Sequence, residues 1–363
     1  MLYNIIRNTN DFKGLKNDWE RIEKKCQNST YFSTYRYCYS WFIHLQNIED
    51  KLFIVTVTNN NKIIAIAPFL IRKVNGKLLK KRVLQFISNG DYADLLIENN
   101  QDIKNSNIVS KIFDALHEND KEWDEINLTH IGQNSVLIHF LLKSKYNKNL
   151  EYLIENPFID FSKFQDYNTY SKKFKIKKIN QYKNKLDKAI RYKVILTSDN
   201  VINSISKIHL AQKNHSNLNS TKKRHSHFEN KQYIKFLNEL YNKNSDVLTY
   251  LIVDTDKNNE IMCYFTGYIH KNKFHSVSTA INPKYNHLSI GRIFNFLIFQ
   301  KNYNDKKWDF FDMGAGRYEW KFELTNSFNL LYTFNFENFK SKKMKFLSKV
   351  EKILRVIKQI LKN

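Results

Sequence analysis

The 363-residue sequence contains only three cysteines, Cys26, Cys38 and Cys263, which are scattered along the chain. Their odd number and wide spacing fit neither a disulfide framework nor a zinc site, so we expect reduced thiols in a cytoplasmic protein. No stretch approaches the roughly 18 apolar residues of a membrane-spanning helix. The opening MLYNIIRNTNDFKG lacks a long apolar run and a small-residue cleavage site, which argues against secretion.

Arginine is also scarce, because only 10 of the 59 basic residues are arginine, although the formal net charge is +24. A charge of this size suggests a nucleic-acid partner. Enrichment in lysine, asparagine and isoleucine can equally come from an AT-rich coding sequence, so the charge alone does not decide the class. Anionic ligands would be attracted in either case.

Hydrophobic residues make up 42% of the chain and aromatic residues 15%, which excludes wholesale disorder. The length favours two domains over one large core. In the first half, Asn59–Lys62 separates two β-rich runs and predicts a hairpin. The elements expected there are helices at 11–25, 34–45, 107–118 and 134–143, and strands at 52–58, 62–72, 81–87, 94–98 and 124–129, with 152–160 closing the domain.

The second half opens with a basic segment at 171–178, a helix and a strand at 192–197. Helices at 200–213, 229–243 and 288–302 and strands at 247–254, 260–270, 273–281, 308–313 and 328–337 are expected to follow. The helix before Trp308 would make a parallel crossover in an otherwise antiparallel sheet. We predict an α/β (α+β) protein with domains 1–165 and 166–339, each a mixed sheet flanked by helices, plus a terminal helix at 340–363.

The most informative segment is the turn before the helix expected at 288–302. Apolar residues at helical spacing, from Ile290 to Ile298, indicate one buried helix face. Ser289 is a candidate N-cap, and Gly291 would allow a ligand to approach the backbone. The free N–H groups of a helix start reached through small residues can bind a pyrophosphate.

This turn resembles the acyl-CoA-binding element of the GNAT acetyltransferase superfamily. Asn286, Ser289 and Gly291 occupy the places of the usual basic or amide residue, first glycine, and second glycine or alanine. The first two depart from the usual residues, and Gly291 conforms.

The runs Trp308–Gly316 and Trp320–Leu324 resemble the BioF2-like (CelD-type) branch of that superfamily, whose relatives are the Fem peptidyltransferases. Phe32–Trp41, Ile63–Phe69 and Asn89–Asp94 follow the same family order, so the resemblance covers nearly the whole chain. It implies tandem GNAT-like domains, of which the second is active, and acetyl-CoA as co-substrate without a metal. The predicted CoA contacts are Ala280, Ile281, Asn286, Ser289, Ile290, Gly291 and Arg292.

Acyl transfer to an amine requires a positioned thioester, proton removal from the nucleophile and stabilisation of the developing oxyanion. Asp312 ends a strand and is expected to orient the acceptor or act as base. Capping of the Gly314–Gly316 turn is the alternative. Lys321 follows an aromatic residue where Fem relatives place a lysine beside the acyl group, so it would stabilise the oxyanion. An exposed strand lysine is the alternative.

The acceptor contacts implied by the resemblance lie in both domains. Asp91, Tyr92 and Asp94 would face the cleft between domains, where a carboxylate pair and a ring suit a cationic or sugar acceptor; a simple β-turn is the alternative. His215 and Trp320 are the other predicted acceptor contacts. The remaining clustered histidines, around His225, lack zinc spacing and predict a loop over the cleft.

The segment 340–363 is expected to form a basic amphipathic helix. Its stripe consists of Phe346, Leu347, Val350, Ile353, Leu354, Ile357, Ile360 and Leu361. Nine basic residues and Glu351 give it a net charge of +8. The stripe would either pack on the protein or place residues 341–363 on an anionic surface at the inner membrane face.

The sequence therefore predicts a bacterial, CoA-dependent N-acyltransferase. Its expected acceptor is an amino sugar, free or nucleotide-linked, in surface-polysaccharide biosynthesis. Two alternatives remain. One is Fem-like transfer of an amino acid from charged tRNA, although no coiled-coil hairpin insertion is visible. The other is a non-catalytic basic binding protein.

Overall fold

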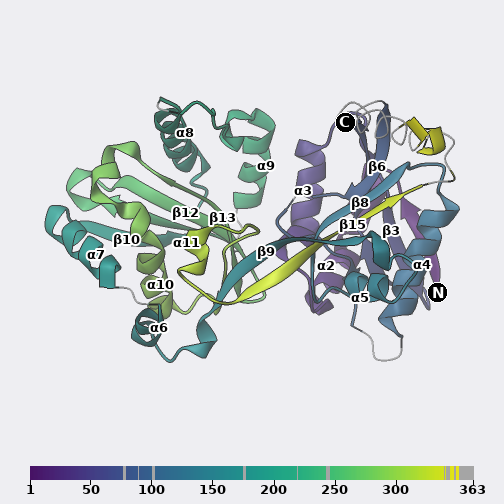
Figure 1. Ribbon diagram of the computed structural model, residues 1–363, viewed down its shortest axis with the longest axis horizontal. Coiled ribbons are helices and arrows are strands. Elements are labelled where there is room, and N and C mark those ends of the chain that lie inside the picture. The colour runs from purple at the N-terminus through teal and green to yellow at the C-terminus, as the bar shows by residue number, and fades with distance from the viewer. Residues whose placement is uncertain are drawn as a thin grey trace, which may run out of the picture. The chain divides into compact units, whose positions relative to one another are not determined.

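The computed structural model describes the whole chain except residues 77–78, 89, 100–102, 175–176, 219, 243–245, 339, 341–343, 347–348 and 351–363. It contains two compact units (Figure 1), one formed by Met1–Ile154 with Leu330–Asn363 and the other by Glu155–Asn329. These boundaries differ from the predicted ones because strand β9 (Leu150–Asp160) runs from one unit into the next. In addition, β15 (Phe328–Glu337) pairs with β8 (Glu125–Gly132) of the first unit.

The first unit contains two sheets. One has the strand order β1-β3-β4-β7, and the other the order β15-β8-β6-β5-β2, in which only β6 and β8 are parallel. The strands not yet defined are β1 (Leu2–Ile6), β2 (Lys51–Leu52), β3 (Ile54–Asn59), β4 (Lys62–Ala67), β5 (Phe69–Asn75), β6 (Lys80–Phe86) and β7 (Leu96–Ile97). The helices are α1 (Thr9–Gly14), α2 (Lys16–Lys25), α3 (Tyr35–Leu45), α4 (Asn105–Glu118) and α5 (Val136–Leu142).

The single strand predicted at 62–72 is two strands that belong to different sheets. The break falls at Pro68, between β4 and β5. Proline has no N–H to donate to a ladder, so the chain leaves one sheet there and enters the other. The strand β1 was not predicted; it pairs with β3, whose residues lie about fifty positions away in the sequence.

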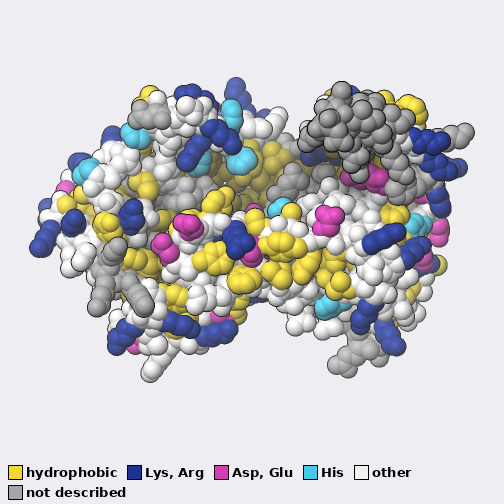
Figure 2. Space-filling model, viewed as in Figure 1, with side chains coloured by type: hydrophobic (Ala, Val, Ile, Leu, Met, Phe, Trp, Pro, Cys, Tyr) yellow, Lys and Arg dark blue, Asp and Glu magenta, His cyan; other side chains and the backbone are white. Residues whose placement is uncertain are grey.

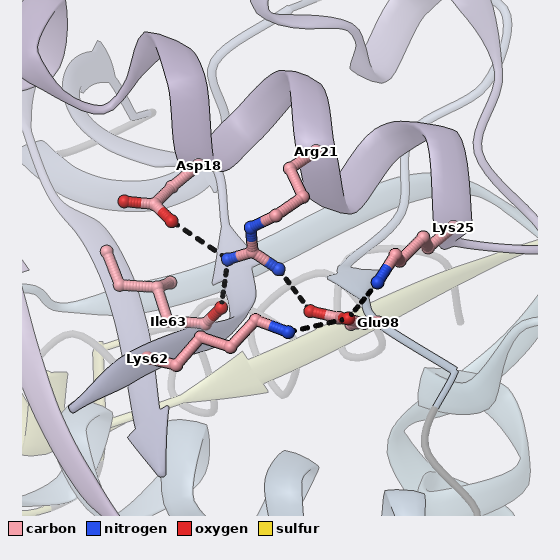
Figure 3. A network of polar contacts seen from close by, with 6 residues as sticks. All are labelled: Asp18, Arg21, Lys25, Lys62, Ile63 and Glu98. Atoms are coloured by element: carbon pink, nitrogen blue, oxygen red, sulfur yellow. Dashed lines mark hydrogen bonds and ion pairs between the residues drawn. The ribbon is translucent and has the colours of Figure 1, made fainter. Parts of the chain in front are cut away.

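A buried carboxylate ties α2 to the first sheet (Figure 3). Glu98 accepts from Arg21, from Lys25 Nζ at 2.8 Å and from Lys62 Nζ at 3.0 Å. Burial by itself would raise the pKa of Glu98, but hydrogen bonds from Lys25 and Lys62 and the charge of Arg21 outweigh burial and lower this pKa from 4.5 to about 2. Ionised Glu98 therefore stabilises the folded unit.

Glu98→Gln should lower the free energy of unfolding of the first unit by roughly 2 kcal/mol at pH 7. This is less than the loss from a fully buried pair because Lys25 and Lys62 still reach water. Since the folded pKa is depressed, the contribution is complete above pH 4.5 and is lost as the pH falls toward 2. Urea titrations at pH 7 and pH 3 should show the difference between wild type and variant shrinking. Glu49→Gln, at an exposed pair with Lys73, should change little at either pH.

The second unit is one sheet with the strand order β10-β11-β12-β13-β14-β9. The pair β13–β14 is parallel and the other pairs are antiparallel. Its further strands are β10 (Tyr192–Thr197), β11 (Val247–Asp254), β12 (Glu260–His270), β13 (Lys273–Ile281) and β14 (Phe310–Asp312). Its helices are α6 (Tyr167–Lys173), α7 (Lys177–Ala189), α8 (Ile202–Leu218), α9 (Lys231–Tyr241), α10 (Phe294–Asp305) and α11 (Glu319–Phe322). Figure 1 shows α8 and α9 on one side of this sheet and α6, α7 and α10 on the other.

The two faces of this sheet differ in chemistry. The α10 face is an aromatic core in which Phe274 stacks on Phe311 at 5.8 Å and Phe299 meets Phe311 edge-on at 4.8 Å. The opposite face, on which α8 packs against β13, carries buried hydroxyl groups. Thr266 Oγ1 there lies 2.9 Å from Thr249 Oγ1 and also bonds the Tyr241 hydroxyl.

The helix predicted at 288–302 begins later than expected. Two 3₁₀ turns, Pro283–Leu288 and Ile290–Arg292, precede α10, which starts only at Phe294. The first turn carries Tyr285 inward, where its hydroxyl donates to Asp254 Oδ2 at 3.1 Å and Glu260 Oε2 at 2.9 Å. These tertiary bonds hold the first turn in place and explain why the helix begins later.

Within the described parts of the chain, no helix is both long enough and apolar enough to cross a membrane. The three cysteines are buried and form no disulfide.

Candidate active site

Strands β13 and β14 pair over only three residues and then separate. The pairing is Lys273 with Phe310, Phe274 with Phe311, and His275 with Asp312. Beyond Asp312 the chain follows β9 instead, because Met313 N donates to Pro157 O and Gly316 N donates to Glu155 O. The β13 backbone from 276 to 281 thus has no strand neighbour on that edge among the described residues. A wedge-shaped gap therefore opens between β13 and β14. The backbone N–H and C=O groups of the unpaired β13 edge can donate hydrogen bonds to a ligand and accept them from it.

Asp312 lies at the closed end of this wedge and is 8% exposed. Its Oδ1 accepts from Gly314 N at 2.8 Å and from Asn156 Nδ2 at 2.9 Å. Its Oδ2 lies 3.3 Å from His275 Nδ1. The bond to Gly314 is the turn-capping contact that the sequence left open as an alternative, and the His275 contact shows that the same carboxylate also faces a second functional group.

Lys321 is part of the short helix α11 and is only 3% exposed, so the alternative of an exposed strand lysine is wrong. Its Nζ donates to Gly314 O at 2.8 Å and to Ala315 O at 3.3 Å. It also lies 5.3 Å from the ring centre of Tyr318. The Asp312 carboxylate therefore accepts from the N–H of Gly314, and the Lys321 ammonium donates to the C=O of the same residue. Both side chains were predicted from the sequence as candidate site residues.

The turn held by Asp312 and Lys321 requires glycine. Gly314 has φ 74° and Gly316 has φ 129°, both in the region that favours glycine. A Cβ at Gly316 would lie 2.7 Å from the Tyr318 ring and 3.7 Å from Lys321 Nζ. The turn thereby leaves room for the lysine to reach its carbonyl partners.

The predicted CoA turn lies at the far end of the unpaired β13 edge. Ser289 is the N-cap residue of the Ile290–Arg292 turn, with φ 55°, but its side chain makes no capping hydrogen bond. Because the backbone of Ser289 is in the left-handed region, the chain changes direction just before Ile290–Arg292. Among the described residues no backbone acceptor bonds the N–H groups of Ile290 and Gly291. Such adjacent N–H groups can bind an anion.

The other predicted CoA contacts have mixed surroundings. Ala280 and Ile290 are buried, so only their backbone groups are suited to contact a ligand. Asn286 and Gly291 are exposed, and a Cβ at Gly291 would lie 2.7 Å from Ile281 Cδ1. The Arg292 guanidinium is also exposed and lies over the Tyr182 ring of α7 at 5.7 Å.

The predicted acceptor residues of the first unit form a partly buried turn. Tyr92 is 8% exposed, and its ring lies 5.8 Å from that of Phe32. Asp94 Oδ1 accepts from the Ser135 hydroxyl at 2.6 Å and from Leu95 N at 2.7 Å. Burial raises the pKa of Asp94 to about 7, against the lowering effect of these two bonds. Asp91 is partly exposed.

The proposed cleft between Asp91 or Asp94 and the Asp312–Lys321 pair stays a prediction, because the structure defines each unit by itself. In the second unit, His215 is exposed on α8 and Trp320 is 45% exposed beside Lys321. His209 Nδ1 lies 2.8 Å from the Ser226 hydroxyl. No cluster of three or more histidine, cysteine or acidic side chains suited to a metal ion occurs in the described residues.

Two residues of the site were missed from the sequence. His275 is a lone histidine in a β-rich run, and Asn156 lies 156 positions from its partner Asp312. The parallel register of β13 and β14 and the pairing of β14 with β9 bring them together. Neither pairing has a local sequence signal.

Comparison with known proteins supports the fold of the second unit. Residues 173–322 match the model of the acetyltransferase (GNAT) domain family. No curated protein sequence matches the chain.

Three solved structures share the fold across nearly their whole length. FemX is 8% identical, with 92% of this chain and 97% of that chain covered and a TM-score of 0.56. L-PGS from Bacillus licheniformis is 10% identical, with 92% and 95% covered and a TM-score of 0.53. A tandem GNAT protein from the clavulanic acid biosynthesis pathway is 7% identical, with 92% and 98% covered and a TM-score of 0.50. The predicted fold class of tandem GNAT-like domains is confirmed, whereas the BioF2-like (CelD-type) branch stays a prediction.

Proposed function

We propose that the chain transfers an acyl group, most simply acetyl, from acyl-CoA to an amine. The observation that carries this proposal is the wedge between β13 and β14. Its unpaired edge leads from the His275–Asp312 pair to the N–H groups of Ile290 and Gly291. A pantetheine chain can bond along such an edge while the pyrophosphate is bound at the turn. Arg292 adds a nearby positive charge.

The residues of the wedge fit the chemistry of acyl transfer. Acyl-CoA supplies an activated carbonyl, and the protein must position it and accommodate the charge that develops on its oxygen. Lys321 is the buried cation at the closed end of the wedge, and the Gly314 and Ala315 carbonyls fix its ammonium group. Asp312 fixes the same turn from the N–H side. The two side chains together fix the conformation of the Gly314–Gly316 turn, which borders the site.

We propose an amino sugar, free or nucleotide-linked, as the acceptor, as in surface-polysaccharide biosynthesis. The support is the pair of exposed rings beside Lys321, Tyr318 at 60% and Trp320 at 45% exposure. Exposed aromatic faces next to a reacting centre suit the apolar face of a sugar ring. Mass spectrometry of products formed from acetyl-CoA and a panel of amino sugars, with and without a UDP group, tests this. Acylation of non-sugar amines alone would exclude it.

A Fem-like reaction with charged tRNA is the second candidate, and one surface favours it. Figure 2 shows lysine, arginine and histidine side chains gathered beside α8. Exposed lysine and arginine residues of this region include Lys207, Lys222, Lys223, Arg224, Lys231 and Lys235. Glu229 is the only acidic residue between 200 and 238. A thermal shift with charged tRNA but none with acetyl-CoA would favour this candidate over the first, and no shift with either would favour a non-catalytic role.

Gly291→Val should weaken acetyl-CoA binding at least about tenfold, or roughly 1.4 kcal/mol. The new side chain would displace Ile281 at the end of β13 and crowd the N–H groups of Ile290 and Gly291. Isothermal titration calorimetry measures the affinity. Gly132→Val is the matched control, because a Cβ at Gly132 meets nothing within 4 Å. Equal affinity in a folded Gly291→Val variant would show that the turn does not bind CoA.

A further inference from the structure

His275 is the buried histidine at the point where β13 and β14 separate. Its side chain is 4% exposed, and it pairs in register with Asp312. The preceding residues of the two strands, Phe274 and Phe311, belong to the aromatic core beneath α10. Because successive strand residues alternate between faces, His275 and Asp312 project from the opposite face, on which α8 packs. They thus lie on the polar face of the sheet, at the closed end of the wedge.

We propose that His275 is the proton acceptor for the incoming amine, and that Asp312 is the residue that orients it. This inference rests on the proposed acyl transfer. Gly314 N and Asn156 Nδ2 both bond Oδ1 of Asp312, and Oδ2 lies 3.3 Å from His275 Nδ1, which is within ion-pair distance of a protonated ring. A carboxylate facing Nδ1 favours the tautomer with its proton there, and Nε2 then becomes the basic nitrogen.

The groups around His275 include one carboxylate, and we infer that Asp312 would stabilise the ring when it accepts a proton. Tyr268 pairs with His275 from β12, and His270 lies farther along the same strand. Burial is the main reason why the pKa of His270 is lowered to about 4. Electrostatic interactions with His275, Lys271 and Lys273 lower it further. His270 is therefore neutral near pH 7, and Asp312 is the anionic neighbour of His275. An imidazolium formed during the reaction would face a carboxylate, as a general base requires.

The step balances without any further reagent. The amine nitrogen forms a C–N bond to the acyl carbonyl carbon, and the C–S bond of the thioester breaks with its electron pair leaving on sulfur. The proton lost by the amine moves to Nε2 of His275 and then to the departing CoA sulfur. The products are the amide and CoA with a free thiol, and His275 returns to its starting state.

Kinetics of the full-length protein with acetyl-CoA and its best amino-sugar acceptor test the role. His275→Gln should lower kcat by about 10²-fold, at the low end of general-base effects. It should leave the Kd for acetyl-CoA within twofold and remove the acidic limb of the kcat/KM pH profile. His270→Gln, the matched change on β12, should keep that limb. A His275→Gln variant that keeps the limb, or loses acetyl-CoA affinity in step with activity, would overturn the inference.

A second measurement needs no acceptor. In the ¹⁵N-histidine spectrum of the full chain, the signal absent from His275→Gln identifies His275. We expect the Nδ1–H tautomer in the wild type and its loss in Asp312→Asn. An Nε2–H tautomer in the wild type would overturn the inference whatever the variants do. If the wild type neither binds acetyl-CoA nor acylates any amine, the proposed function itself fails; if it does both and His275→Gln is unchanged, only the role of His275 fails.

Discussion

Lys321→Met should lower kcat by about 10²–10³-fold, the usual loss when one donor to a developing oxyanion is removed. Burying an ammonium group is costly unless it is well bonded. Lys321 is 3% exposed, and its Nζ donates to the Gly314 and Ala315 carbonyls. A methionine of similar length fills the same space but supplies no charge to a developing oxyanion. Steady-state assays with acetyl-CoA and an amine acceptor measure the effect.

Two comparisons separate catalysis from folding. Lys183→Met, at the more exposed pair with Asp187 on α7, should leave kcat unchanged. The midpoint of thermal unfolding shows whether Lys321→Met still folds, since the lysine also fastens the turn. A folded Lys321→Met variant with near wild-type kcat would remove Lys321 from the chemistry and leave it as a support for the Gly314–Gly316 turn.

Hairpin strands were the part of the fold most accurately predicted from sequence. In the second unit, the strands expected at 247–254, 260–270 and 273–281 have those bounds in the structure. The turns explain this accuracy. Asn60–Asn61, Asn258–Asn259 and Lys271–Asn272 all have positive φ, a conformation that asparagine adopts more readily than most residues. Local turn chemistry and β-branched runs therefore agree at each hairpin.

The missed features depend on contacts between distant residues. The strand β1 alternates exposed and half-buried positions over only five residues, a pattern too short to identify without β3. The delayed start of α10 depends on the buried bonds of Tyr285 to Asp254 and Glu260. Family resemblance predicted roles for Asp312 and Lys321, but only the fold shows that one bonds the N–H and the other the C=O of Gly314. His275 required the strand register as well.

The last prediction concerns the basic segment 341–363, most of which lies outside the described residues. Apolar side chains at helical spacing are each worth roughly 1.5–3 kcal/mol if fully buried, so some surface must cover the stripe. Phe346, a described member of the stripe, is 60% exposed, which leaves it available to a partner surface. Each basic residue near an anionic leaflet adds about 1 kcal/mol, and salt weakens this attraction.

We therefore expect the full chain to float with vesicles containing phosphatidylglycerol at low salt and to be released at high salt. Deletion of 341–363 should abolish flotation without abolishing acyl transfer. Replacing Lys349, Lys352, Lys358 and Lys362 with glutamine keeps the stripe but removes four of the eight net positive charges of 340–363, so it should weaken flotation and reduce its salt dependence. If the stripe packs on the protein itself, flotation should be absent at every salt concentration. Full-length protein that stays in solution with these vesicles at low salt would exclude the membrane role and leave 341–363 as a packing element.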